Sequence, residues 1–246
     1  MFNLSKAAEV MGVSHARAAS LIHAATARGL VTHVRRGLYN LVPFELGSTN
    51  FHLEDRYSLV RESMENTPYF LSHASAFDIH RLATQPSFDV YVTSTKRRKN
   101  LNLGGSLTHF VWAPPGRFFG FEVMRGSNLS VSDLERTLLD GASLPENCGG
   151  LIEVAKAFFA AKTRIDIQKL IGYMHRFDKI SVIRRAGFLL ETLELADTRL
   201  LEELAKNLPM GYVKLDPSMP DEGPSNSKWG LKLNVSVDQI KNAVSH

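Results

Sequence analysis

Residues 4–43 read LSKAAEVMGVSHARAASLIHAATARGLVTHVRRGLYNLVP, and this pattern predicts two helices joined by a tight turn, followed by a two-stranded hairpin. Ser5 stands where an N-cap would start the first helix, and Gly12-Val13-Ser14 supplies a stop, an apolar contact and a new N-cap. We expect the second helix from about His15 to Arg28, with its apolar face formed by Ala18, Leu21, Ile22 and Ala25. This order of elements is that of a winged helix-turn-helix.

The hairpin is expected to be the wing. Strand-forming residues at 31–34 and 38–42 flank Arg35-Arg36-Gly37, and glycine in such a turn tolerates a positive φ. The paired arginines would then lie at the tip, where a wing meets phosphates or the minor groove. The alternative is a winged helix that binds protein, with solvated arginines.

The outward face of the second helix is small and polar and contains no carboxylate. A helix that enters the major groove needs slim side chains and hydrogen-bonding groups near its N-terminal end. We therefore predict DNA binding by this module. The predicted DNA-binding residues are Ser14, His15, Arg17, Ser20, His23, Arg35 and Arg36.

A chain of 246 residues is long enough for two domains, each with a core of its own. We expect a winged helix-turn-helix domain at 1–46 and a mixed α/β domain at 51–246, which makes the fold class α+β. Pro43 to Asn50 has the composition of a linker. In the second domain, short strands at 90–131 precede helices from Asp133, and a last strand pair near 212–215 and 229–235 is expected to return to the sheet.

Cysteine content and hydropathy exclude several classes of protein. The single cysteine, Cys148, rules out an intramolecular disulfide, and no Cys/His cluster has zinc-site spacing. The N-terminal residues do not have the pattern of a signal peptide, and the longest apolar runs, such as 157–161, are too short to span a bilayer. We expect a cytoplasmic protein without a membrane partner.

The charge is unevenly distributed, although the net charge is only +4. Residues 90–130 and 150–187 hold fourteen of the 29 lysines and arginines but four of the 25 carboxylates. This segregation suggests a second electropositive surface, built from Lys96, Arg97, Arg98, Lys99, Arg176, Lys179, Arg184 and Arg185. Two interpretations stay open: a solvated loop, or a phosphate-binding edge for RNA or operator DNA.

Catalytic patterns are weak. The chain contains no Asp/Glu-x-Lys triplet, no GxxxxGK phosphate loop and no GxGxxG fingerprint. Ser72 and His73, with Asp78 and His80 nearby, are better interpreted as a capping serine and half-buried histidines than as a catalytic triad. We expect no catalytic residue, metal or cofactor.

The sequence around Asp133 is interpreted as structural. Asp133 is expected to cap a helix, and Arg136 is expected to tie its turns together through Asp140.

Several strings along the chain carry a resemblance to a known family. They are Arg36–Tyr39, Leu71–Ala76, His80–Gln85, Ser132–Asp140, Gly149-Gly150, Arg185–Glu191 and Ser227–Asn234. In this order they resemble the AbiEi-type antitoxin family, the transcriptional regulators of type IV abortive-infection toxin–antitoxin systems used in phage defence. The chain departs from the pattern at its start, where the leading helix common in winged domains is short or missing.

The resemblance implies a DNA-binding antitoxin whose N-terminal domain represses its own two-gene operon. Its C-terminal domain would counteract a nucleotidyltransferase-like toxin, either by direct contact or through the toxin's RNA substrate. The implied partners are operator DNA, the cognate toxin and RNA. The alternatives are a stand-alone winged-helix regulator and a nucleic-acid-processing enzyme with a winged-helix targeting domain.

Overall fold

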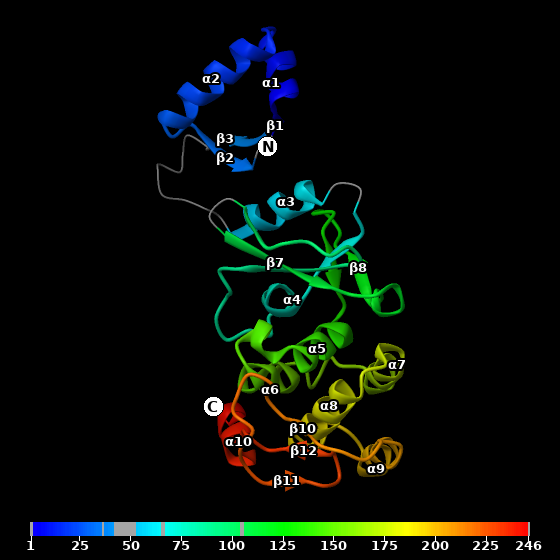
Figure 1. Ribbon diagram of the computed structural model, residues 1–246. Helices are drawn as coiled ribbons and strands as arrows, with labels where there is room; N and C mark the ends of the chain where they lie inside the picture. Colours follow the sequence, from blue (N-terminus) through cyan, green and yellow to red (C-terminus); the bar gives the residue numbers. More distant parts are fainter. Residues whose placement is uncertain (1, 36, 42–52, 65–66, 104–105, 246) are drawn as a thin grey trace. The chain divides into compact units, whose positions relative to one another are not determined.

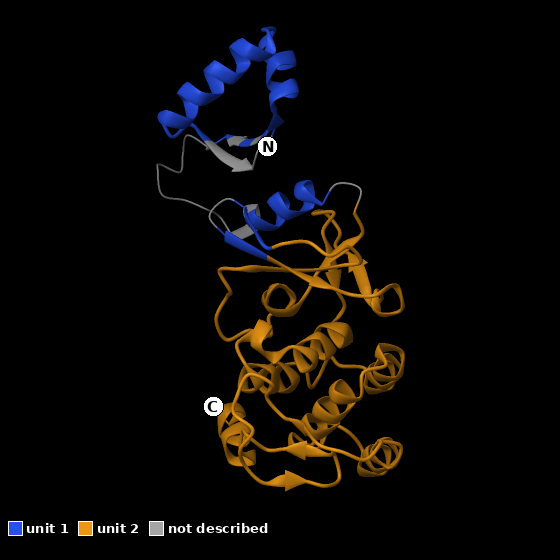
Figure 2. Ribbon diagram, in the orientation of Figure 1, with its two compact units in different colours: residues 1–66, 100–108 blue, residues 67–99, 109–246 orange. Residues whose placement is uncertain are grey.

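The computed structural model describes residues 2–35, 37–41, 53–64, 67–103 and 106–245 (Figure 1). Helices and sheets both contribute, so the predicted α+β class is confirmed. Two compact units are present, and neither is one continuous segment (Figure 2). Unit 1 comprises Met1–Asn66 and Asn100–Thr108, and unit 2 comprises Thr67–Lys99 and His109–His246. The predicted linker at 43–50 lies outside the described residues.

Unit 1 begins with two helices and a hairpin. Its first elements are β1 (Phe2–Asn3), α1 (Leu4–Met11), α2 (His15–Ala27), β2 (Val31–Arg35) and β3 (Leu38–Leu41). The N-cap of α1 is Asn3 rather than the predicted Ser5, because Asn3 Oδ1 accepts a hydrogen bond from Lys6 N at 2.7 Å. Gly12, at φ 63°, then ends α1, and Ser14 caps α2 as predicted.

Strand β1 was not predicted. It pairs antiparallel with β3 and gives a three-stranded sheet in the order β1-β3-β2. The Phe2 and Tyr39 rings stack across this pair, with centroids 5.9 Å apart. The core beneath is small and contains Ala7, Ile22 and Val31. Leu21, predicted on the buried face of α2, is instead 39% exposed.

The rest of unit 1 comes from two distant segments. Helix α3 (Leu53–Ser63) buries Tyr57 and Val60, which lie three residues apart on one face of the helix. Strand β6 (Leu101–Leu103) pairs antiparallel with the first residues of β7 (Ser106–Trp112) and contacts α3. The remaining residues of β7 belong to unit 2.

Unit 2 contains the main part of a six-stranded sheet in the order β6-β7-β5-β4-β9-β8. Its further strands are β4 (Tyr69–Leu71), β5 (Val90–Ser94), β8 (Phe121–Val123) and β9 (Ser130–Ser132). Strand β4 pairs antiparallel with β5 and parallel with β9. Helix α4 (His73–Ile79) follows β4 directly and contacts β5.

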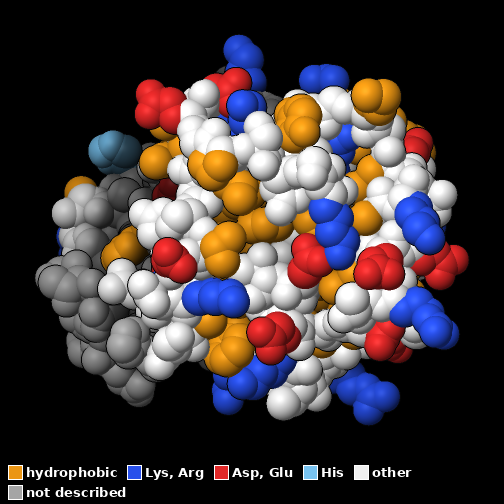
Figure 3. Space-filling view, turned by 90° about the horizontal axis from the view of Figure 1, so that it is seen from below, with side chains coloured by type: hydrophobic (Ala, Val, Ile, Leu, Met, Phe, Trp, Pro, Cys, Tyr) orange, Lys and Arg blue, Asp and Glu red, His pale blue; other side chains and the backbone are white. Residues whose placement is uncertain are grey.

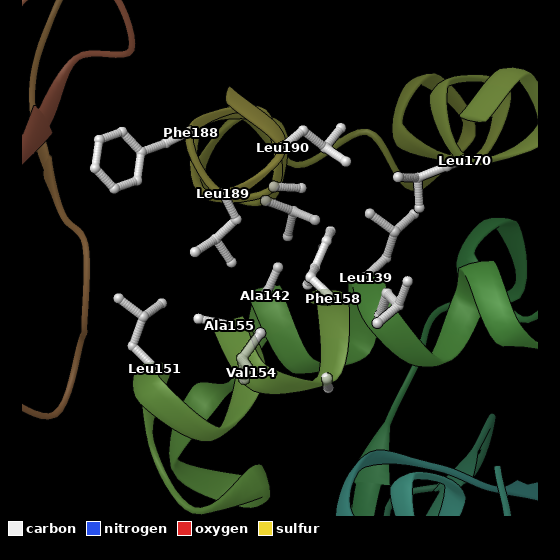
Figure 4. Close-up of a cluster of buried hydrophobic side chains, with 14 of the residues drawn as sticks. Leu139, Ala142, Leu151, Val154, Ala155, Phe158, Leu170, Phe188, Leu189 and Leu190 are labelled. Carbon is white, nitrogen blue, oxygen red and sulfur yellow. The ribbon is translucent and has the colours of Figure 1, made fainter. Parts of the chain in front are cut away.

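A helical layer completes the unit 2 core. Its helices are α5 (Leu134–Ser143), α6 (Leu151–Ala160), α7 (Ile167–Phe177), α8 (Ile180–Thr192), α9 (Thr198–Lys206) and α10 (Val237–Val244). Short 3-10 turns lie at Pro115–Arg117 and Pro145–Cys148. Leu139 on α5, Phe158 on α6 and Leu189 on α8 are fully buried within the cluster that Figure 4 shows.

The last strands do not return to the main sheet, so that prediction is wrong. Strands β10 (Val213–Lys214), β11 (Ser225–Asn226) and β12 (Leu231–Lys232) form a separate sheet in the order β10-β12-β11. Short strands with partners of their own satisfy their backbone groups locally, so they need no edge of the larger sheet.

Helix α8 approaches this small sheet closely through a glycine. The Trp229 side chain is fully buried, and its Nε1 donates to Glu191 Oε2 at 2.6 Å. A Cβ atom on Gly187 would lie 2.1 Å from the Trp229 ring. Only glycine therefore lets the α8 backbone pack against the indole.

We predict that Gly187→Ala lowers the free energy of unfolding by at least about 1–3 kcal/mol, because an overpacked core must shift the indole or the helix. The matched control is Gly172→Ala on α7, where a Cβ would meet no atom within 4 Å. That change should stabilise the protein by about 0.5–1 kcal/mol, because alanine favours helix more than glycine does. Thermal or urea unfolding measures both. Equal effects of the two substitutions would contradict the close packing.

Candidate nucleic-acid interfaces

Helix α2 exposes most of its surface. Only Ala18 and Ile22 of its residues are buried. His15, Arg17, Ser20 and His23, the predicted DNA-binding residues of this helix, are all exposed.

The serines of α2 have local roles. Ser14 Oγ accepts from Arg17 N at 3.3 Å, so it caps the helix at the end that would face DNA. Ser20 Oγ donates to Ala16 O at 3.2 Å, and its hydroxyl therefore offers acceptor lone pairs to the outside rather than a donor. At Ser20, the polar face of α2 therefore presents a hydrogen-bond acceptor.

The hairpin tip is described in part. Arg35 is the last residue of β2, and Gly37 in the turn has φ 81°. This conformation fits the predicted need for glycine at that position. Arg36 lies outside the described residues.

On unit 2, the basic run from Lys96 to Lys99 follows β5 and is exposed. The Arg97 guanidinium lies over the Trp112 ring, 4.2 Å from its centroid. Trp112 is 43% exposed, and its Nε1 donates to Thr95 O at 3.2 Å, which fixes the ring. Arg98 Nη2 donates to Thr67 Oγ1 at 2.8 Å. The run is therefore an ordered edge that carries an arginine–tryptophan stack.

The prediction that Arg184 and Arg185 join an exposed basic surface is wrong. Both are buried, at 3% and 5% exposure. Arg184 donates to the carbonyls of Pro209, Gly211 and Gly230. Arg185 donates to the carbonyls of Lys214, Ala142 and Ser143. These arginines tie α8 to β10, to the C-terminal end of α5 and to the segments around 209–211 and Gly230, where buried backbone carbonyls need donors.

Arg176 and Lys179, the other two predicted residues, lie near the end of α7. Arg176 is exposed, and its guanidinium lies 4.1 Å from the Phe119 ring centroid. Lys179 is half-buried, and its Nζ donates to Ser143 Oγ at 3.0 Å. Burial lowers the pKa of Lys179, the charges of Arg185 and Arg117 lower it further, and Glu146 opposes them.

Two parts of this surface line the same cavity, which has a volume of about 110 Å³. Its lining includes Trp112, the stacking partner of Arg97, as well as Lys179. The other polar and charged side chains of the lining are His73, Thr93, Arg117, Arg136, Asp140 and Ser143. We refer to it as the His73 cavity. The cavity could not be predicted from the sequence, because its residues come from separate elements and share no motif.

The Asp133–Asp140 segment behaves as predicted. Asp133 caps α5 by accepting from Arg136 N at 2.9 Å, and Arg136 Nε donates to Asp140 Oδ1 at 2.9 Å. Arg136 Nη1 also donates to the carbonyls of Arg117 and Phe119, at 2.7 and 2.9 Å. Asp140 Oδ2, also buried, has no hydrogen-bond partner among the described residues.

Ser72 and His73 differ from the prediction in detail. Ser72 precedes α4, but its hydroxyl makes no capping bond. Instead Ser72 Oγ lies 2.9 Å from His73 Nδ1 and accepts from Thr93 Oγ1 at 2.8 Å. His73 is fully buried rather than half-buried, whereas His80 is half-buried, with its Nε2 2.7 Å from Ser132 O. Asp78 Oδ2 accepts from Ser87 N.

The electrostatics of the His73 cavity follow from this burial. Burial lowers the pKa of His73 from 6.5 to about 4; Asp140 opposes the shift, and Arg136 and Lys179 add to it. His73 is therefore neutral at neutral pH. Since Arg136 and Asp140 form an ion pair, the formal charge that remains in the lining is that of Arg117 and Lys179.

Another face of unit 2 has a different distribution of charge. The face over the C-terminal elements, seen in Figure 3, shows lysine or arginine side chains intermixed with carboxylates and apolar groups. No field of one sign is expected there. We take the exposed run at 96–99 with Trp112, together with the His73 cavity, as the candidate interface of unit 2.

Comparison with known proteins identifies a solved structure with a similar fold but no matching family. No family model matches the chain, and no curated protein matches it. Among solved structures, the chain resembles the crystal structure of the RV2827C protein from Mycobacterium tuberculosis, with a TM-score of 0.70 and 14% sequence identity. The match covers 93% of this chain and 83% of that one. The two proteins share a fold.

Two further observations concern the described residues alone. None of their helices is long and apolar enough to cross a membrane. Within the same part of the chain, no three His, Cys, Asp or Glu side chains are grouped so that they could hold a metal ion.

We predict that His73 makes stability depend on pH between about 6.5 and 4. In this window the unfolded chain protonates His73 and the folded chain does not, so stability falls as pH falls, by up to about 1.4 kcal/mol per pH unit. His73→Asn should reduce this slope in urea titrations across the window. Asparagine also tolerates the φ of 50° found there.

His23→Asn on the exposed face of α2 is the control for removing an imidazole as such. If unfolding free energy has the same slope against pH in wild type and in His73→Asn, a neutral buried His73 is contradicted.

Proposed function

We propose that the N-terminal elements, β1 to β3, form a winged helix-turn-helix that binds operator DNA. The observation that carries this proposal is the surface of α2: a capped helix of 13 residues, exposed along its length and free of carboxylates, with a hairpin next in the chain. In such modules the second helix lies in the major groove and the wing contacts the backbone or the minor groove. His15 and Arg17 stand at its N-terminal end.

We further propose that the chain is an antitoxin of the AbiEi type. The ordered strings from Arg36–Tyr39 to Ser227–Asn234 support this proposal. In this view the module represses the chain's own operon, and unit 2 counteracts a nucleotidyltransferase-like toxin. We expect the protein to act in the cytoplasm, where both the operon and the toxin's RNA substrate are found. The exposed basic run at 96–99 is the part of unit 2 whose chemistry suits RNA.

DNA binding is tested by its salt dependence. Replacing Arg17, Arg35 and Arg36 with alanine should weaken binding to every sequence and reduce the slope of log K against log salt by about one unit for each phosphate that is no longer neutralised. A mobility-shift titration of wild type and variants at several salt concentrations measures this slope. Arg199→Ala on α9 of unit 2 removes one exposed arginine from elsewhere and should leave the slope unchanged.

Ser20→Ala provides a second contrast in the same titrations. It removes an outward acceptor without removing charge, so it should change the ratio of operator to random-DNA affinity at a constant slope. An unchanged slope in the arginine variants would refute the assignment of α2 and the hairpin as the DNA-binding surface.

The antitoxin role is tested on unit 2. We predict that Arg97→Glu combined with Arg98→Glu impairs the rescue of cells that express the neighbouring toxin gene, while operator affinity is retained. Unfolding free energy should fall by about 1–2 kcal/mol, because the stack of Arg97 on Trp112 and the hydrogen bond of Arg98 to Thr67 are lost, and thermal melts verify that the variant folds. Lys162→Glu, another exposed cation beside an aromatic ring, is the matched control. Full rescue by the double variant would mean that the run is only a solvated loop.

A further inference from the structure

One residue that lines the His73 cavity carries a buried acceptor that the protein does not satisfy. Asp140 is 2% exposed, and its Oδ2 has no hydrogen-bond partner in the described part of the chain. Leaving a buried charged acceptor unpaired is costly, and native proteins rarely do so without a ligand or water. A volume of about 110 Å³ is several times the roughly 10–15 Å³ that one water needs. The cavity thus has room for a ligand larger than a water molecule.

The charges of the lining suit an anion. Arg136 and Asp140 compensate each other at 2.9 Å, and His73 is neutral at neutral pH, so Arg117 and Lys179 determine the net charge. Lys179 Nζ already donates to Ser143 Oγ, which holds it in place with two further N–H groups to offer. A phosphate group is a strong acceptor for lysine and arginine together.

The rim of the cavity suits a planar group. Trp112 lines the cavity, is 43% exposed and carries Arg97 on its ring at 4.2 Å. Exposed aromatic rings and arginine planes stack with nucleobases regardless of base identity. A cationic interior and a stacking rim in one cavity match the two ends of a nucleotide.

We propose that the His73 cavity binds a nucleoside monophosphate unit. Its phosphate contacts Lys179 and Arg117, and its base stacks on Trp112. The unit is either a free mononucleotide or the terminal nucleotide of a single strand, because both present the same chemistry. This proposal does not depend on DNA binding by the N-terminal module, which lies in unit 1.

The two tryptophans make the full chain its own reporter. Trp229 is fully buried, so a ligand that stacks on Trp112 should quench only the exposed indole. We expect saturable quenching by adenosine monophosphate, or by an oligoadenylate that carries a 5′-phosphate. Quenching by the first identifies the free nucleotide as a ligand, and quenching by the second alone identifies the strand end. Inorganic phosphate should compete with either ligand without quenching.

Two variants test the phosphate contacts. Lys179→Gln and Arg117→Ala should each weaken binding at least about tenfold, as expected when one charge-assisted hydrogen bond is removed. Glutamine keeps a donor for Ser143, and thermal melts verify that both variants fold. Lys162→Ala is the control and should bind as wild type does. Arg17→Ala should also bind nucleotide normally, which separates this test from that of DNA binding.

Two results would overturn the proposal. One is the absence of both quenching and phosphate-dependent binding, the latter measured by equilibrium dialysis with labelled nucleotide. The other is unchanged affinity in folded Lys179→Gln and Arg117→Ala. Trp112→Phe should abolish the fluorescence change while dialysis still detects weakened binding, because a phenyl ring stacks less well than an indole.

Discussion

The buried ion pair of Arg136 and Asp140 is the contact on which unit 2 depends. Arg136 is 1% exposed, and its guanidinium lies about 5 Å from the rings of Phe70, Phe119 and Phe177, which come from β4, the loop before β8 and α7. Burying two charges costs free energy that only good geometry and further hydrogen bonds offset. Here the two loop carbonyls that Arg136 Nη1 binds supply those bonds, so one side chain joins sheet, loop and helices.

Local interactions were the predictable part of this molecule. Asp133 as a cap and the Arg136–Asp140 pair follow from spacings of three and four residues, which place side chains on one helix face. The bounds of α2 also follow from its caps. Strand β1 could not be predicted, because two residues have no periodicity and its partner β3 is far along the chain. Strands β10 and β12 lie within the predicted strand pair, but the sheet that they join was predicted wrongly, because a single sequence does not specify strand partners.

The candidate site was predictable only as a charge distribution. A count of lysines and arginines identifies the basic segments, but it does not show which of these side chains are buried. Arg184 and Arg185 are buried because they donate to backbone carbonyls at 142–143, 209–214 and 230, none of which is adjacent to them in sequence. The run at 96–99 does lie on the surface, yet its relation to Lys179 depends on Trp112, which no pattern singles out. Cavities form where elements that are distant in sequence pack together, and a single sequence does not show which elements do so.

The division of the chain has a consequence for biosynthesis. Unit 1 is completed by Asn100–Thr108, which leave the ribosome only after Thr67–Lys99 of unit 2. Domains generally fold as units during synthesis, from the N-terminus onward. The segment from β1 to β3 can therefore assemble early, whereas α3 must wait for β6. A nascent chain stalled before residue 100 would present the first helices and hairpin together with an α3 that lacks β6 and an incomplete unit 2.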